Sequence, residues 1–93
     1  MTETAAEALR VYYPEAQVDI CVEECAELVK AICKWKRYGR SYLELEQVVD
    51  EIADVRIMIE QMTLLFGATA VAERIEFKLE RLRQRMERRK AGA

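Results

Sequence analysis

The sequence of 93 residues contains no histidine, one proline, three glycines and no uncharged apolar run long enough to cross a membrane. Without histidine, Ser–His and Cys–His catalysis and most zinc enzymes are excluded. A membrane-spanning helix needs about 20 predominantly apolar residues, so we expect no membrane partner. The first residues, MTETAAEALR, lack the basic start and apolar stretch of a signal peptide, so we expect a cytoplasmic protein.

Cysteine is scarce as well, and the charges nearly balance. In a cytosol we expect Cys21, Cys25 and Cys33 to be reduced thiols. Cys21 and Cys25 could bind a soft metal, but inside an apolar stripe such residues more often pack as small core side chains. The 15 Lys and Arg residues face 17 Asp and Glu residues, a net charge of −2. Proteins that bind nucleic acid are usually basic, so we expect no nucleic-acid partner.

The few helix-breaking residues divide the chain into four predicted helices. A capping box over Thr4-Ala-Ala-Glu7 predicts the start of a short first helix, and Pro14 begins the second. A capping box over Ser41-Tyr-Leu-Glu44 predicts the start of the third helix, which ends at Gly67. The predicted helices cover residues 4–13, 14–38, 41–67 and 69–89.

These helices predict one all-α domain over residues 1–93. Short connections favour an antiparallel helical bundle, with a short N-terminal helix and three long helices per chain. The third helix is apolar over most of its circumference, so we expect it to be central and largely buried. A monomer of this size cannot hide so apolar a helix, so we expect oligomerisation to complete the bundle.

Two pairs of acids stand out against this apolar background. Glu24 lies at the border of the apolar face of the second helix, and Glu27 follows three residues later on the same side. Glu51 and Asp54 have the same spacing and project into the apolar sector of the third helix, where an uncompensated carboxylate is costly.

Two interpretations of these acids are open. In the first, Glu24 and Glu27 form a solvated edge, while Glu51 and Asp54 pair with basic groups of the last helix. In the second, both pairs face one pocket, where four carboxylates would repel one another. A hard divalent cation removes that cost, and oxygen ligands without histidine or thiolate suit Mg²⁺ or Mn²⁺.

The four acids also form a recognisable motif: Glu24-Cys-Ala-Glu27, a spacer of 23 residues, and Glu51-Ile-Ala-Asp54. This E-x-x-E … E-x-x-D pattern resembles the MazG-like branch of the all-α nucleoside triphosphate pyrophosphohydrolases, in the form of a short stand-alone member. The similarity is close over residues 18–66, where EECAELVKAICKWKR and VVDEIADVRIMIEQM resemble the two metal-binding helices of that family.

The resemblance implies Mg²⁺-dependent hydrolysis of an NTP or dNTP to the nucleoside monophosphate and pyrophosphate, with a metal-activated water as nucleophile. It implies that Glu24, Glu27, Glu51 and Asp54 bind the metal, with Mn²⁺ as an alternative ion. One of these carboxylates would instead orient the attacking water, and we favour Glu27. The resemblance also implies a homodimer or homotetramer.

Basic and aromatic residues are candidates for substrate contacts. Lys78 and Arg81 match a Lys-x-x-Arg in the final helix of short family members, which implies phosphate binding; interhelix and intersubunit salt bridges are the structural alternative for most of that helix. Lys30 and Lys34 are alternative phosphate contacts, although surface lysines are usually only solvated. Trp35 could stack on a nucleobase, although a Trp near a helix end is more often a packing anchor.

Two other functions remain open. A catalytically degenerate relative would bind a nucleotide, or act as a helical protein-interaction module, without chemistry; the presence of all four carboxylates argues against it. A DNA-binding or antitoxin-like adaptor would use the basic last helix, because residues 68–93 carry eight basic and four acidic groups. The net negative charge and the apolar stripe of that helix argue against this function.

Overall fold

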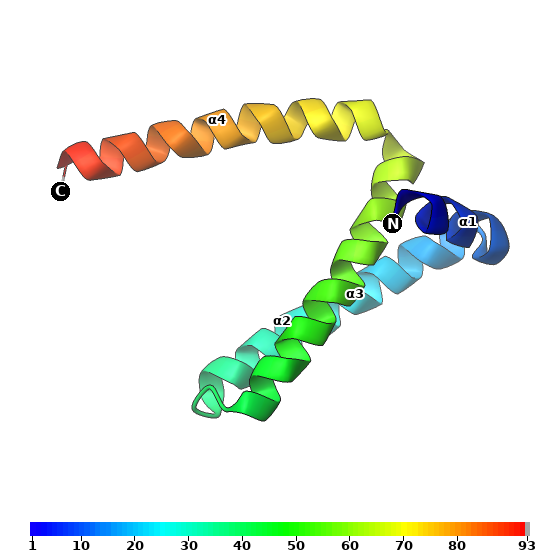
Figure 1. Cartoon of the computed structure of the whole chain (residues 1–93), viewed down its shortest axis with the longest axis horizontal. Coiled ribbons are helices and arrows are strands. Elements are labelled where there is room, and N and C mark those ends of the chain that lie inside the picture. Colours follow the sequence, from blue (N-terminus) through cyan, green and yellow to red (C-terminus); the bar gives the residue numbers. More distant parts are fainter. Residues whose placement is uncertain (93) are drawn as a thin grey trace.

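The computed structural model describes residues 1–92 and shows four helices joined by short connections, with no strand among these residues (Figure 1). The all-α prediction is therefore confirmed. The helices are α1 (Thr2–Tyr12), α2 (Pro14–Arg37), α3 (Tyr42–Phe66) and α4 (Ala68–Gly92).

The start of α1 differs from the prediction. The helix begins at Thr2, no side chain caps it, and the Ala5 amide donates to the Met1 carbonyl oxygen. Thr4 therefore lies inside the helix, and the predicted capping box at Thr4 is wrong. The first turn is held instead from outside, because the Thr2 hydroxyl donates to the Glu60 carboxylate of α3 at 3.0 Å.

The other helix boundaries follow local chemistry, as predicted. Pro14 occupies the first turn of α2, where its missing N–H is not needed. Ser41 caps α3, since its hydroxyl oxygen accepts a hydrogen bond from the Glu44 amide at 3.3 Å. Between these helices the backbone reverses through Gly39 and Arg40, both with positive φ. The boundaries of α2 and α3 thus confirm the sequence prediction to within a residue.

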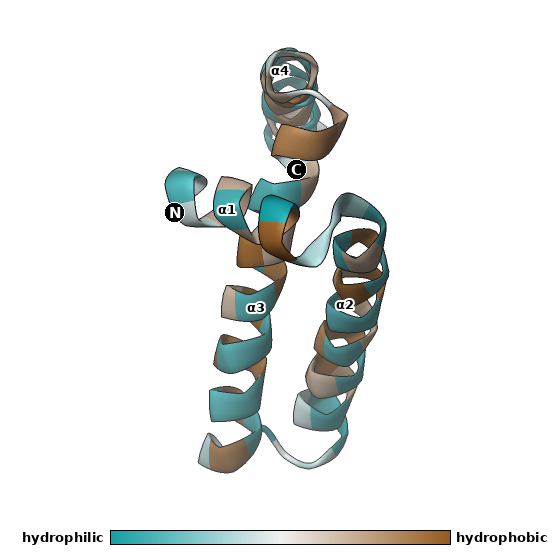
Figure 2. Cartoon of the chain, turned by 90° about the vertical axis from the view of Figure 1, so that its right-hand side faces the viewer, coloured by the Kyte–Doolittle hydropathy of each residue, from teal (hydrophilic) through white to brown (hydrophobic). Residues whose placement is uncertain are grey.

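Helices α2 and α3 lie side by side as a hairpin, with α1 across one end of it (Figure 2). Few side chains of these three helices are buried. Among apolar residues these are Ala5, Cys21, Ala31 and Met58. Gln17 and Gln61 are also buried, and the Gln17 side-chain amide donates to the Gln61 carbonyl oxygen at 2.7 Å. A polar pair therefore ties α2 to α3 in the small core.

Helix α4 leaves the hairpin instead of returning along it (Figure 1). Its axis bends by 116° from that of α3, at Gly67, whose φ of +127° favours glycine. None of its residues up to Gly92 is buried. The radius of gyration is 16.8 Å, compared with roughly 12 Å for a compact chain of this length. Within one chain, α4 is therefore a projecting arm.

The single chain also leaves much apolar surface open. Helix α3, expected to be largely buried, has only Met58 and Gln61 buried, because α1 and α2 cover one side of it.

None of the four described helices has, by itself, the length and apolar character needed to cross a membrane.

The Gln17–Gln61 hydrogen bond predicts a non-additive effect on stability. Gln17→Leu leaves the Gln61 amide without its partner, so we expect the free energy of unfolding to fall by about 1–3 kcal/mol. Gln61→Leu should have a similar effect, and the double variant should lose less than the two single losses combined. Urea denaturation of the four proteins measures this coupling, and additive losses would contradict it.

Candidate metal centre

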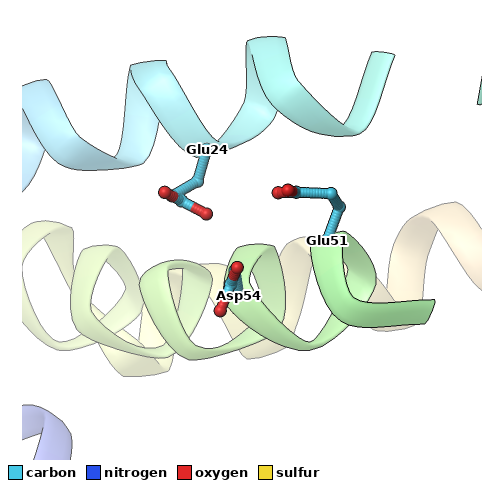
Figure 3. A group of neighbouring side chains, drawn as sticks. All are labelled: Glu24, Glu51 and Asp54. Atoms are coloured by element: carbon cyan, nitrogen blue, oxygen red, sulfur yellow. The ribbon is translucent and has the colours of Figure 1, made fainter. Parts of the chain in front are cut away.

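Helices α2 and α3 bring the two acidic motifs together. Residues three apart on a helix lie on the same side, so α2 presents Glu24 and Glu27 along one flank, and α3 presents Glu51 and Asp54. In Figure 3 the carboxylates of Glu24 and Glu51 point into the space between the helices, and Asp54 lies next to both. Each helix therefore contributes carboxylates to a shared site.

Three of the four carboxylates form a tight group. One oxygen from each of Glu24, Glu51 and Asp54 lies within 4.8 Å of the others. Glu24 and Glu51 are half-buried, whereas Asp54, expected to be inside the apolar sector, is exposed. The oxygens are thus close enough to share one cation, and the site opens to solvent on the Asp54 side.

No ion pair balances this charge among the described residues. Within residues 1–92 the ion pairs are Arg83–Glu80 and Lys90–Glu87, both inside α4 and far along the chain from the cluster. One oxygen of Glu51, Oε2, is fully shielded from solvent and has no hydrogen-bond partner. A buried carboxylate oxygen without a partner is costly, so the structure leaves a place for a positive ligand at this atom.

The mutual repulsion appears in the protonation of Glu24. Its pKa is raised above the ordinary value, first because of partial removal from water and then because of the negative charges of Asp54, Glu51 and Glu27. Glu24 therefore holds its proton to higher pH than an isolated glutamate when no cation is bound. A divalent cation would favour the ionised form and displace that proton.

The donor set fits Mg²⁺ or Mn²⁺. It consists of carboxylate oxygens alone, the ligand type that these hard cations prefer. The predicted ligands Glu24, Glu51 and Asp54 are brought together, but Glu27 is not part of the tight group. The exposed Glu27 side chain lines an adjacent pocket together with Glu51. Glu27 thus lies next to the cluster, where it can act on a bound molecule.

The cysteines do not form a metal site among the described residues. Cys21 is buried, and burial, together with the neighbouring Cys25, raises the pKa of its thiol. A protonated thiol is a poor metal ligand. This agrees with packing as the role of Cys21, while Cys33 is exposed.

The predicted substrate-contact residues lie away from the cluster in the single chain. Lys78 and Arg81 are on the exposed arm α4, where they line a hollow of about 440 Å³ with Phe77. Trp35 is half-buried near the end of α2, and the Arg40 guanidinium lies 4.9 Å from its ring centroid. Neither Lys78, Arg81 nor Trp35 lines the pocket beside Glu51.

The pocket beside Glu51 is lined by Lys30 and Lys34, which were predicted from the sequence only as alternative phosphate contacts. Lys30 and Lys34 of α2 face Gln47 and Asp50 of α3 across it. The i, i+3 and i+7 spacing from Glu27 to these lysines is visible in the sequence. Their position beside the cluster, however, depends on how α3 packs on α2.

No protein-family model, no curated protein and no solved structure matches this chain. The motif residues and their geometry are therefore the guide to its function.

The unbalanced cluster predicts how the chain responds to Mg²⁺. At neutral pH we expect Mg²⁺ to raise the free energy of unfolding, by about 2.7 kcal/mol at a hundred times its Kd. Glu51→Gln should abolish this gain. Without a divalent cation, the same variant should be as stable as the wild type or more stable, because it removes repulsion and no ion pair.

Glu23→Gln is the matched control, since Glu23 is exposed on α2 and outside the cluster. It should keep the full Mg²⁺ effect. Thermal unfolding with Mg²⁺ or EDTA measures both variants. A metal-free Glu51→Gln protein that is clearly less stable than the wild type would favour a structural role for Glu51.

Proposed function

We propose that this chain hydrolyses a nucleoside triphosphate, an NTP or dNTP, to the monophosphate and pyrophosphate in an Mg²⁺-dependent reaction. The observation that carries the proposal is the convergence of Glu24, Glu51 and Asp54 within 4.8 Å, with no ion pair to any of them among the described residues. Their E-x-x-E … E-x-x-D spacing, similar to that of the MazG-like pyrophosphohydrolases, supports the same reaction.

The chain's own residues have separate tasks in this proposal. Glu24, Glu51 and Asp54 hold Mg²⁺, and the shielded Oε2 of Glu51 gains a partner. Held there, Mg²⁺ would supply positive charge to neutralise the phosphates and to make a nearby water more acidic. Glu27, at the edge of the cluster, accepts a hydrogen bond from the attacking water and takes up its proton as the α–β anhydride bond breaks.

We also propose that the chain works as a homo-oligomer, a dimer or a tetramer. Its surface is 7516 Å², about 2,000 Å² more than a folded monomer of this mass exposes. Two chains that hid such an excess would bury an area typical of obligate assemblies. The apolar stripe of α4 supports this assembly, since Ile75, Leu79, Leu82 and Met86 are exposed along the arm.

The charges favour α4 as the element that binds a second copy. Residues 68–93 have a net charge of +4 and residues 41–67 a net charge of −5, so the arm of one chain complements α3 of another. In such an assembly, Lys78 and Arg81 would bind phosphate in the partner's site, which they do not reach within their own chain. Trp35 remains the candidate for stacking on the base.

The proposed reaction is tested with a panel of NTPs and dNTPs in the presence of Mg²⁺. We expect pyrophosphate to be released without stepwise loss of phosphate. Glu51→Gln should lower kcat/KM by more than about a hundredfold. Loss of a residue that only hydrogen-bonds to a metal ligand already costs about ten- to hundredfold in metal affinity or activity, and Glu51 is itself a proposed ligand. Separating nucleotides and pyrophosphate chromatographically identifies the products.

Glu23→Gln again serves as the control and should retain full activity, since Glu23 lies outside the cluster. Turnover that survives EDTA or Glu51→Gln would refute the proposal. Nucleotide binding without turnover in the wild type would instead support a degenerate nucleotide-binding module.

The proposed assembly predicts an effect of charges in the apolar stripe of α4. Leu79→Glu combined with Leu82→Glu should convert the oligomer to monomers, because each substitution places a carboxylate in the buried contact. Gln84→Glu, which adds one carboxylate on the opposite side of the helix, should leave assembly intact. Sedimentation velocity measures the masses, and a monomeric wild-type chain would contradict the proposal.

A further inference from the structure

A pocket of about 340 Å³ lies between α2 and α3, directly beside the acidic cluster. It shares Glu51 with the cluster, and its other lining side chains are polar except for Ala31. The lining residues are Glu27, Lys30, Ala31 and Lys34 of α2 and Gln47, Asp50 and Glu51 of α3. Ala31 is buried, so a methyl group is all that α2 places at its base. The pocket therefore adjoins the proposed metal site at Glu51.

The charge of this groove changes sign along its length. On α2 the acidic Glu27 is followed by Lys30 and Lys34. On α3 the acidic Glu51 and Asp50 are followed, one turn nearer the start of that helix, by the neutral Gln47. With a rise of 1.5 Å per residue, Lys34 lies about 10 Å beyond Glu27 along the helix. The end of the pocket at Glu51, where a cation would bind, thus lies next to the end that carries the positively charged lysines.

Neither lysine is committed to a carboxylate. Throughout residues 1–92 the only ion pairs are in α4, so Lys30 and Lys34 have no acidic partner within 4.0 Å, although Glu27 and Asp50 line the same pocket. Lys34 is half-buried, which makes an unpaired ammonium group more costly there than on an open surface. Both lysines can therefore donate hydrogen bonds to a bound anion.

We infer that Lys30 and Lys34 form a phosphate subsite, which binds the part of a polyphosphate chain that extends beyond the acidic cluster. This rests on the proposed function, because it takes the substrate to be a nucleoside triphosphate. The carboxylate end holds phosphate through Mg²⁺, and the lysine end binds phosphate oxygens directly. A planar base does not fit this role, because the pocket lining contains no aromatic side chain.

The subsite is tested with Lys30→Gln combined with Lys34→Gln. We expect the Kd for inorganic pyrophosphate in the presence of Mg²⁺, and the KM for the best nucleotide, to rise at least about tenfold. The affinity for Mg²⁺ alone should be unchanged or higher, because two positive charges next to the acids have been removed. Titration calorimetry measures both affinities on the same protein. A merely structural role of the lysines would not weaken one affinity and spare the other.

Two further variants control for charge. Lys36→Gln combined with Arg37→Gln removes the same charge from exposed positions of α2 outside the pocket, and it should leave both affinities unchanged. Lys30→Arg combined with Lys34→Arg keeps the positive charge, and it should retain pyrophosphate binding to within about threefold. Circular dichroism verifies that each variant is folded.

The outcomes separate this inference from the proposed function. If the Lys-to-Gln protein hydrolyses nucleotide with unchanged KM and pyrophosphate affinity, the subsite is wrong and the reaction stands. If the wild type hydrolyses no nucleotide but binds pyrophosphate through these lysines, the reaction is wrong and the subsite stands. If the wild type binds no pyrophosphate, or if Mg²⁺ affinity falls with pyrophosphate affinity, the subsite is overturned.

Discussion

Electrostatic repulsion between carboxylates on two facing helices is the constraint on which the site depends. Glu24 on α2 meets Glu51 and Asp54 on α3, and among the described residues no arginine or lysine forms an ion pair with them. A protein that only needed to fold would gain from replacing any of these acids with an amide. The arrangement is explained if a bound divalent cation offsets the repulsion. The shielded Oε2 of Glu51 is the atom at which we would expect that cation to bind.

The hairpin that carries the acids has two separate anchors. At one end the Gln17–Gln61 hydrogen bond joins α2 to α3, and at the other the short connection before the Ser41 cap limits how far the helices can slide. The acidic cluster lies between these anchors. Since a shift by one residue rotates a helical side chain by about 100°, the alignment of Glu24 with α3 depends on both anchors holding the register.

Sequence reasoning was most successful where structure depends on neighbouring residues. Pro14, Ser41 and Gly67 act through local backbone chemistry, and each marks a helix boundary as predicted. The capping box at Thr4 failed because α1 is held by a distant contact, from Thr2 to Glu60. Helical spacing and the motif predicted a site of four acids, of which Glu24, Glu51 and Asp54 cluster and Glu27 does not. The exposure of Asp54 depends on which side of α3 its neighbours cover.

Other features depended on three-dimensional arrangement that no spacing rule contains. The position of Lys30 and Lys34 next to the acids becomes apparent only once α3 completes the pocket. The direction of α4 depends on the backbone angle at Gly67, so its predicted return along the bundle does not occur within one chain. Local patterns therefore identified the candidate residues, while the neighbours of those residues followed from the packing.

Gly67 has a wider consequence for how copies of this chain fit together. Its φ of +127° is available to glycine and strained for other residues, and it alone separates α3 from α4. The angle between the two helices is therefore governed by rotation about the bonds of a single residue. In the assembly proposed above, this one joint would set the direction of each arm, so a side chain at position 67 would change how the arms are spaced while every individual helix stayed intact.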